Sequence, residues 1–246
     1  MRSFAVLLTL VSALPCVSAD LPSGESLMAR YIQVTGGEAA YAKIKNVSMA
    51  GDIEMAGRNV AGSVSIVEAG EKAYMALDFA GIGKVEECYD GVNAWESSAI
   101  SGPRLLEGDE KASIRQASSI AVITGWRDIY KQTRTVGSEE VEGKPAWKVE
   151  MTPKEGQPET FYFDQESGLL VRVKSVLSSA MGDINSDLEM SDYRDIDGIR
   201  SPLTMTEKVM SQNIVMRFTS VVYNGMIPSG RFDPPAEVAA LLARKR

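Results

Sequence analysis

The chain has 246 residues, of which 44% are hydrophobic and 24% are charged, a composition typical of folded globular proteins. Acidic residues outnumber basic ones by 33 to 26, and the formal net charge of −7 at pH 7 disfavours binding to the phosphate backbone of nucleic acids. The chain has no histidine, which excludes a Ser-His-Asp triad, a Cys-His dyad and imidazole ligands for zinc. We therefore expect no nucleic-acid partner, and few hydrolytic mechanisms remain.

The first residues have the layout of a secretory signal peptide. Arg2 gives a positive start, an apolar run covers residues 4–14, and Val17 and Ala19 place small residues before a cleavage site. The sequence predicts a signal peptide over residues 1–19, a mature domain over residues 20–246, and no run near the ~20 apolar residues that a membrane-spanning helix needs. Cys16 leaves a second interpretation open, namely lipidation of this cysteine in place of cleavage after Ala19.

Two helices are predicted at the start of the mature chain. Ser23 is placed to cap the first, and Gly36-Gly37 to end it. Glu38 to Lys45 has the pattern of a second, shorter helix. On the first helix the apolar side chains share one face, which consists of Leu27, Met28, Tyr31 and Ile32.

The rest of the chain alternates with a period of two, which is typical of strands with one face in water. Turn signals such as Asp90-Gly91, Glu142-Gly143 and Asp197-Gly198 separate the alternating segments. We count about eleven or twelve strands and expect a mainly β (α+β) protein, a single antiparallel meander that forms an incomplete β-barrel covered by a few helices.

One predicted interruption divides the strands into two runs. Gly102-Pro103 breaks the strand pattern, Asp109 can cap a helix that runs to about Ser118, and residues 120–130 form a further helix or loop. After Pro234-Pro235, residues 236–246 are expected to form a short helix or a frayed tail. No linker composition marks a boundary, so we expect one domain with a helical insertion.

The acidic clusters do not have the spacing of catalytic or metal sites. Around Asp192, Asp195 and Asp197 the intervening residues break the alternation that a calcium loop requires. Glu86 and Glu87 are neighbours on a strand, so their side chains point to opposite faces and cannot share one substrate bond. We predict a non-catalytic protein with no metal site and no cofactor.

Among the residue types of this chain, methionine is the one whose chemistry bears on binding. Unbranched, polarizable side chains suit a pocket for flexible apolar chains, but they also fill ordinary cores, and the sequence leaves both interpretations open. The methionines on the apolar faces of predicted strands are Met49, Met55, Met75, Met151, Met190, Met205 and Met216.

Short motifs along the mature chain resemble those of the LolA/LolB-like lipoprotein-localisation carriers, and especially the outer-membrane lipoprotein-sorting proteins. They are mostly turns and strand starts and cover nearly the whole mature chain: Tyr31 to Ile44, Gly51, Tyr89-Asp90-Gly91, Ala94-Trp95, Gly102-Pro103-Arg104, residues 136–143, Phe161 to Asp164, Gly168 to Arg172, Asp192 to Gly198, Pro202 and Phe232-Asp233. Such motifs are more specific for fold than for function.

The resemblance implies an incomplete antiparallel barrel around helices, with an apolar cavity that holds the acyl chains of a lipoprotein or lipid in the periplasm. It admits a membrane-anchored donor or acceptor protein as a partner. Two alternatives stay open, an envelope regulatory or sensor module of the same fold and, less favoured, a hydrolase using carboxylates. The residues expected to bind acyl chains are Met49, Ile53, Met75, Leu77, Phe79, Trp95, Phe163, Val171, Met205, Met216 and Phe218.

Overall fold

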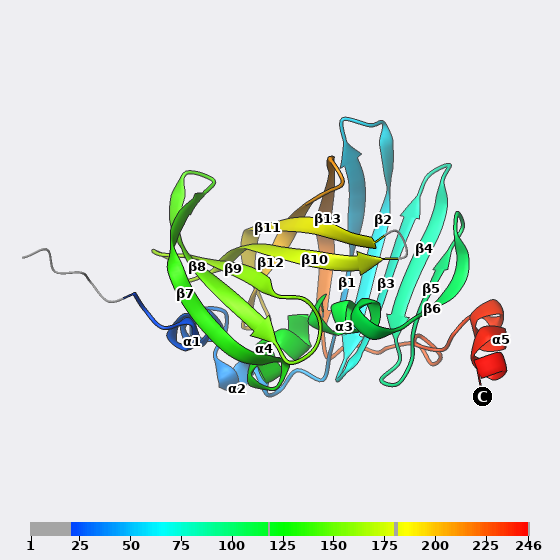
Figure 1. Ribbon diagram of the computed structural model, residues 1–246, viewed down its shortest axis with the longest axis horizontal. Helices are drawn as coiled ribbons and strands as arrows, with labels where there is room; N and C mark the ends of the chain where they lie inside the picture. Colours follow the sequence, from blue (N-terminus) through cyan, green and yellow to red (C-terminus); the bar gives the residue numbers. More distant parts are fainter. Residues whose placement is uncertain (1–20, 118, 180–181, 246) are drawn as a thin grey trace, which may run out of the picture.

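A computed structural model describes residues 21–117, 119–179 and 182–245; the predicted signal peptide and Cys16 lie outside these ranges. Within them, thirteen strands form one antiparallel sheet that is not closed into a barrel (Figure 1). The strands are β1 (Asn46–Ala56), β2 (Val60–Ala69), β3 (Lys72–Phe79), β4 (Gly83–Tyr89), β5 (Ala94–Ser98), β6 (Gly102–Leu106), β7 (Tyr130–Val141), β8 (Lys144–Pro153), β9 (Glu159–Asp164), β10 (Leu170–Ser179), β11 (Gly182–Ile196), β12 (Ile199–Val209) and β13 (Gln212–Tyr223).

The order of the strands confirms the fold class and refines the predicted connectivity. From one edge to the other the order is β6-β5-β4-β3-β2-β1-β13-β12-β11-β10-β9-β8-β7. The sheet is therefore two meanders, β1–β6 and β7–β13, and not a single one. They join through the antiparallel pair of β1 with β13, in which Ile53 lies opposite Met216.

Five helices are seen among the described residues: α1 (Gly24–Val34), α2 (Glu38–Tyr41), α3 (Gly108–Ala117), α4 (Ser119–Ile129) and α5 (Ala236–Lys245). The predicted cap of α1 is confirmed, because the Ser23 side chain accepts a hydrogen bond from the Ser26 amide at 3.1 Å. α2 is shorter than predicted. It ends before Lys45, whose amide donates to the Asn224 side chain at 2.7 Å as the backbone enters β1.

The predicted helical insertion is confirmed as α3 and α4, between β6 and β7. α4 is broken at Gly125, which has non-helical φ and ψ of −126° and 22°. α3 contacts both β4 and β10, which six other strands separate in the sheet order. The sheet must therefore bend for one helix to reach both strands, and α3 lies inside the bend (Figure 1).

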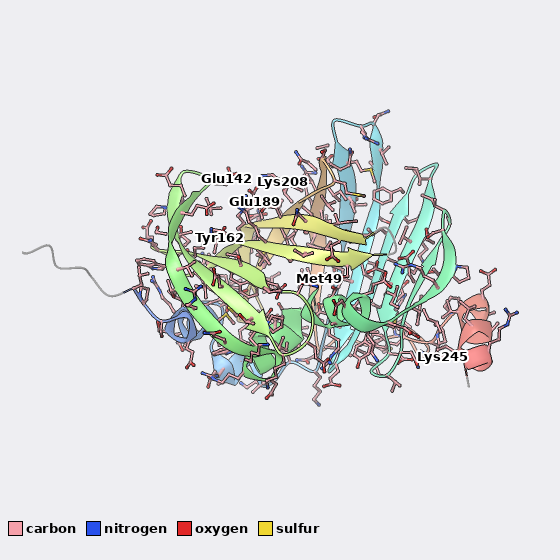
Figure 2. All side chains as sticks on the ribbon, viewed as in Figure 1. Met49, Glu142, Tyr162, Glu189, Lys208 and Lys245 are labelled. Carbon is pink, nitrogen blue, oxygen red and sulfur yellow. The ribbon has the colours of Figure 1, made fainter. Side chains whose placement is uncertain are left out.

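The two faces of the sheet carry different helices. We call the face that packs on α1, α2, α3 and α4 the inner face, and the opposite one, which packs on α5, the outer face. Ile120 of α4 packs with Met49 and Ile53 on the inner face, and Val238 of α5 packs with Trp95 on the outer face. Met49 lies near the centre of the molecule (Figure 2).

Two glycines allow close contact between neighbouring strands. A Cβ atom on Gly51 would lie 2.0 Å from the carbonyl oxygen of Arg217, and one on Gly62 would lie 1.9 Å from that of Asp78. The pairing of β1 with β13 also shifts register beside Gly51, as expected for a β-bulge. No larger residue fits at either position without movement of the backbone.

Candidate functional site: the inner face of the bent sheet

A row of apolar side chains crosses the seam between the two meanders. Met190 on β11 lies opposite Met205 on β12, which lies opposite Met216 on β13. Met216 in turn lies opposite Ile53 on β1. Directly opposed residues on one face touch across the strands, so these four side chains form a continuous apolar strip, the methionine row.

A second row runs across the first meander. Met49 on β1 lies opposite Ile66 on β2, which lies opposite Met75 on β3. We call these three residues the β1–β3 row. Both rows belong to the inner face, since Met49, Ile53 and Met216 pack in one cluster with Ile120 of α4.

The inner face has a buried floor and an uncovered part. Five of the residues predicted to bind acyl chains form the floor, each less than 9% exposed: Met49, Ile53, Phe79, Met216 and Phe218. Other inner-face residues keep part of their apolar surface in contact with solvent: Met55, Val60, Ile66, Met75, Leu77, Val85, Leu203, Met205 and Ile214. The helices therefore cover only part of the apolar face.

Aromatic rings fill the end of the inner face near α1. Phe163, another predicted binding residue, is fully buried there. Its ring centroid lies 6.0 Å from that of Tyr31 on α1 and 6.2 Å from that of Phe161. Phe163 is on the predicted face, but its contacts are with the protein itself.

A cleft of about 530 Å³ opens where α2, α3 and α4 meet. Its apolar side includes Ile44 and Ile120, which also pack against the floor residues. At its rim, Arg115 of α3 forms an ion pair with Glu155 of the β8–β9 loop at 3.7 Å. The lining is completed by Tyr41, Ala42, Gly70, Glu71, Ala112, Thr124, Gly125, Asp128, Ile129 and Lys154. The cleft is thus an opening in the helical cover that is separated from the apolar floor by Ile44 and Ile120.

The prediction that Trp95 and Val171 share this face is wrong. Trp95 lies opposite Cys88 and packs with it on the outer face, because α5 gives that face an apolar cluster of its own. Val171 packs against Tyr162 on the outer face. A register shift between Leu170 and Arg172 interrupts the alternation there, so Leu170 packs on the inner face instead.

Two acidic side chains of the inner face have raised pKa values. Burial raises the pKa of Glu159 to about 7, and the hydrogen bond that it accepts from Tyr130 only partly offsets this. Burial, followed by repulsion from Glu96, raises the pKa of Glu87 to about 7. As predicted, Glu86 points to the opposite face from Glu87 and accepts a hydrogen bond from Tyr74 at 2.6 Å. In the described ranges, no three acidic or cysteine side chains are grouped to hold a metal ion.

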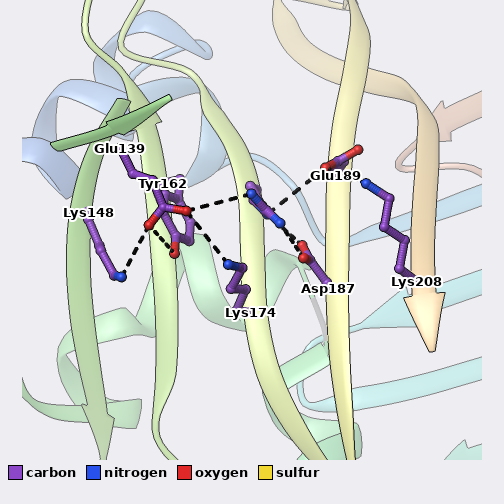
Figure 3. A network of polar contacts seen from close by, with 8 residues as sticks. Glu139, Lys148, Tyr162, Lys174, Asp187, Glu189 and Lys208 are labelled. Carbon is purple, nitrogen blue, oxygen red and sulfur yellow. Dashed lines mark hydrogen bonds and ion pairs between the residues drawn. The ribbon is translucent and has the colours of Figure 1, made fainter. Parts of the chain in front are cut away.

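The outer face of the second meander carries a charged network around Tyr162 (Figure 3). Three cationic groups lie 5.5–5.8 Å from the centroid of this buried ring, those of Lys148, Arg172 and Lys174. Arg172 is bound by Asp187, with Glu139 and Glu189 each 4.0 Å away. Burial alone would raise the pKa of Asp187, but the bonds from Arg172 outweigh it and lower the pKa. The network pairs its own charges, so we assign it a structural role.

Arg172→Met is expected to lower the free energy of unfolding by about 1–3 kcal/mol, because it leaves half-buried carboxylates without their partner. Lys174→Met is the matched control. Its side chain is 39% exposed with a single ion pair at 3.7 Å, and such pairs contribute at most about 1 kcal/mol. Urea unfolding of both variants measures the difference, and equal losses would contradict the central role of Arg172.

Several solved structures have the same fold as this chain. A DUF1329 family protein from Desulfovibrio piger has a TM-score of 0.57 at 18% identity, with 88% of this chain and 100% of that chain covered. A LolA superfamily protein from Nitrosomonas europaea has a TM-score of 0.56 at 12% identity, with 87% and 99% covered. A putative outer membrane lipoprotein-sorting protein domain from Vibrio parahaemolyticus has a TM-score of 0.55 at 10% identity, with 85% and 96% covered.

Sequence comparisons give no further assignment. No family model matches the chain, and no curated protein matches it. No helix of the described ranges has the length and hydropathy to cross a membrane. The structural matches bear on the architecture alone, at identities of 10–18%. They confirm the architecture that the sequence motifs imply, and the chain has a LolA-like fold.

Proposed function

We propose that this chain is an exported, non-catalytic carrier or binder of acyl chains, those of a lipoprotein or of a lipid. The observation that supports this is the uncovered part of the inner face, where Met75, Leu77 and Met205 keep apolar surface in contact with solvent. Methionine adapts to ligands of variable shape, and a partly covered apolar face suits a flexible apolar chain. The cleft between α2, α3 and α4 lies next to the floor, behind Ile44 and Ile120.

The predicted signal peptide supports export, and the LolA-like fold supports the periplasm as the place of action. In that compartment an acyl chain in transit needs shelter from water, because each CH₂ group left exposed to water costs about 0.8 kcal/mol. A membrane-anchored donor or acceptor would load or unload such a carrier. Native mass spectrometry of the protein purified from the periplasm tests the cargo directly. We expect masses that correspond to the protein with acylated molecules bound.

Polar substitution on the uncovered face is expected to weaken binding of a fluorescent fatty probe. Met75→Gln and Met205→Gln each place an amide where the acyl chain would lie, and we expect a loss of roughly tenfold in affinity, or about 1.4 kcal/mol. Met226→Gln is the control, because Met226 is 95% exposed and the next residue, Ile227, packs in the outer-face cluster. Phe218, at 3% exposure, is a poor choice because its substitution also disrupts the floor.

The measurement is a probe titration on each folded variant, with circular dichroism to verify folding. Unchanged affinity in both inner-face variants would contradict the assignment of the site. Absence of probe uptake by the unsubstituted protein would overturn the proposed function.

A further inference from the structure

The β1–β3 row does not stay apolar as it continues across the sheet. Met75 lies opposite Glu87 on β4, Glu87 lies opposite Glu96 on β5, and Glu96 lies opposite Arg104 on β6. All of these residues share the inner face with Met49 and Ile66, since directly opposed residues point to the same side. An apolar strip therefore ends in a charged group at the β4–β6 side of the molecule.

Most of that charged group is satisfied internally. The Arg104 guanidinium donates to Glu96 at 2.7 and 3.2 Å and to Glu110 of α3 at 2.6 Å. Glu96 also accepts from the Ser101 hydroxyl at 3.0 Å. Two carboxylates thus share one cation, and both are held in place.

Glu87 is different from its neighbours. It makes no hydrogen bond or ion pair with any other side chain or amide in the part of the chain that the structure describes. It is half-buried beside Met75. A partly buried carboxylate is stabilised by charge-assisted hydrogen bonds, which Glu87 does not receive from the described residues. Its carboxyl oxygens, which are not among the buried unpaired atoms of the described residues, are therefore available to a group from outside the chain.

The charges that surround Glu87 restrict what this group can be. Among the described residues that act on it most strongly, Glu96 on β5, Glu110 on α3 and Glu207 on β12 have the same sign. Arg104 on β6 has the opposite sign. An incoming carboxylate or phosphate would meet net repulsion. An ammonium group would be attracted and could donate hydrogen bonds to Glu87.

We propose that Glu87 binds the polar end of an amphiphile whose chain lies along the β1–β3 row, and that this end is a protonated amine. The inference rests on the proposed function, which supplies the apolar part of the ligand. With strands about 4.8 Å apart, Met49 and Glu87 are separated by three strand spacings, so one medium-length chain reaches from the floor to the carboxylate. Glu87 is a specificity-determining residue in this arrangement.

Three probes with the same chain length test the proposal: dodecylamine, dodecanol and dodecanoate. Each is titrated into the unsubstituted protein, Glu87→Gln and Asp78→Asn, with displacement of a fluorescent fatty probe as the readout. Asp78→Asn is the matched control, because it removes a carboxylate from an exposed position on β3, next to Leu77.

At pH 8 we expect the unsubstituted protein and Asp78→Asn to bind dodecylamine at least about tenfold more tightly than dodecanoate. Glu87→Gln should lose about tenfold in affinity for the amine and bind dodecanoate no worse than before. Lowering the pH from 8 to 5.5 should weaken amine binding to the unsubstituted protein, because Glu87 becomes protonated as the pH falls through about 7. Glu87→Gln should not show this dependence.

The outcomes separate this inference from the proposed function. Equal affinities for the amine and dodecanoate, or an unchanged preference in Glu87→Gln, would overturn the role of Glu87 while the apolar site still stands. Failure of all three probes to bind would overturn the proposed function itself. Circular dichroism and urea unfolding of Glu87→Gln verify that the variant is folded.

Discussion

Glu159→Gln is expected to raise the free energy of unfolding at pH 8 by about 2–3 kcal/mol and to change it little at pH 5. Glu159 is 9% exposed, and burial raises the pKa of its carboxyl to about 7. Each unit of difference from the unfolded chain corresponds to about 1.4 kcal/mol. Glutamine carries no charge and can still accept the hydrogen bond from Tyr130.

The direction of this pH dependence follows from proton binding. Because the pKa of Glu159 is higher in the folded state, that state holds the proton more tightly, and its contribution to stability falls as the pH rises from about 4.5 to 7. Groups with lowered pKa values act in the opposite sense. The pKa of Asp164 is one example, since hydrogen bonds to Ser167 outweigh its burial. Their stabilisation is lost as the pH falls below about 4, so we expect maximal stability near pH 5.

Urea unfolding of the unsubstituted protein and Glu159→Gln at pH 5, 6.5 and 8 measures this effect. Glu140→Gln on the exposed part of β7 is the control and should change the free energy of unfolding by no more than about 0.5 kcal/mol at each pH. A pH-independent difference between Glu159→Gln and the unsubstituted protein would show that the charge of Glu159 is not the cause.

Trp95→Ala is expected to lower the free energy of unfolding by roughly 3–5 kcal/mol, the usual cost of removing a large buried aromatic side chain. Trp95 is 1% exposed and packs between the sheet and Val238 of α5. The folded fraction should bind the fatty probe as before, because this side chain lies on the face opposite to the proposed site. The measurement is a urea titration together with probe binding in the absence of urea.

This prediction separates structural from binding residues. Phe79→Ala removes an aromatic side chain from the inner-face floor, where it packs near Met49, and it should reduce both stability and probe affinity. A selective loss of probe affinity in Trp95→Ala, with stability unchanged, would contradict the placement of Trp95 on the outer face.

Local patterns in the sequence predicted most of the elements because short-range chemistry determines them. The Ser23 cap of α1 and the alternation of Val47, Met49, Ile53 and Met55 are examples. The pairing of β1 with β13 could not be predicted. It depends on which edge strand of the first meander meets which edge strand of the second after both have formed. For the same reason the sequence indicates a single meander where the structure has two.

The face of each candidate site residue was predictable where its strand alternates regularly, as at Met75 and Met205. It was not predictable where the alternation is interrupted. A bulge beside Leu170 places Val171 on the opposite face, and α5 gives the outer face an apolar cluster around Trp95. Glu87 was missed as a site residue for another reason. The sequence shows two adjacent glutamates. Only the strand register reveals that one of them, Glu87, ends an apolar row, where it has no partner among the described residues.

The seam between β1 and β13 also has a consequence for the folding of the chain. It joins residues separated by most of the described sequence, such as Val47 and Tyr223, so the entropy of closing a very long loop opposes its formation. Such non-local pairing is slow. Until the C-terminal strand is available, the backbone amides and carbonyls along one side of β1 have no strand to pair with. During synthesis this edge of β1 is therefore open to pairing with strands of other chains, which favours aggregation.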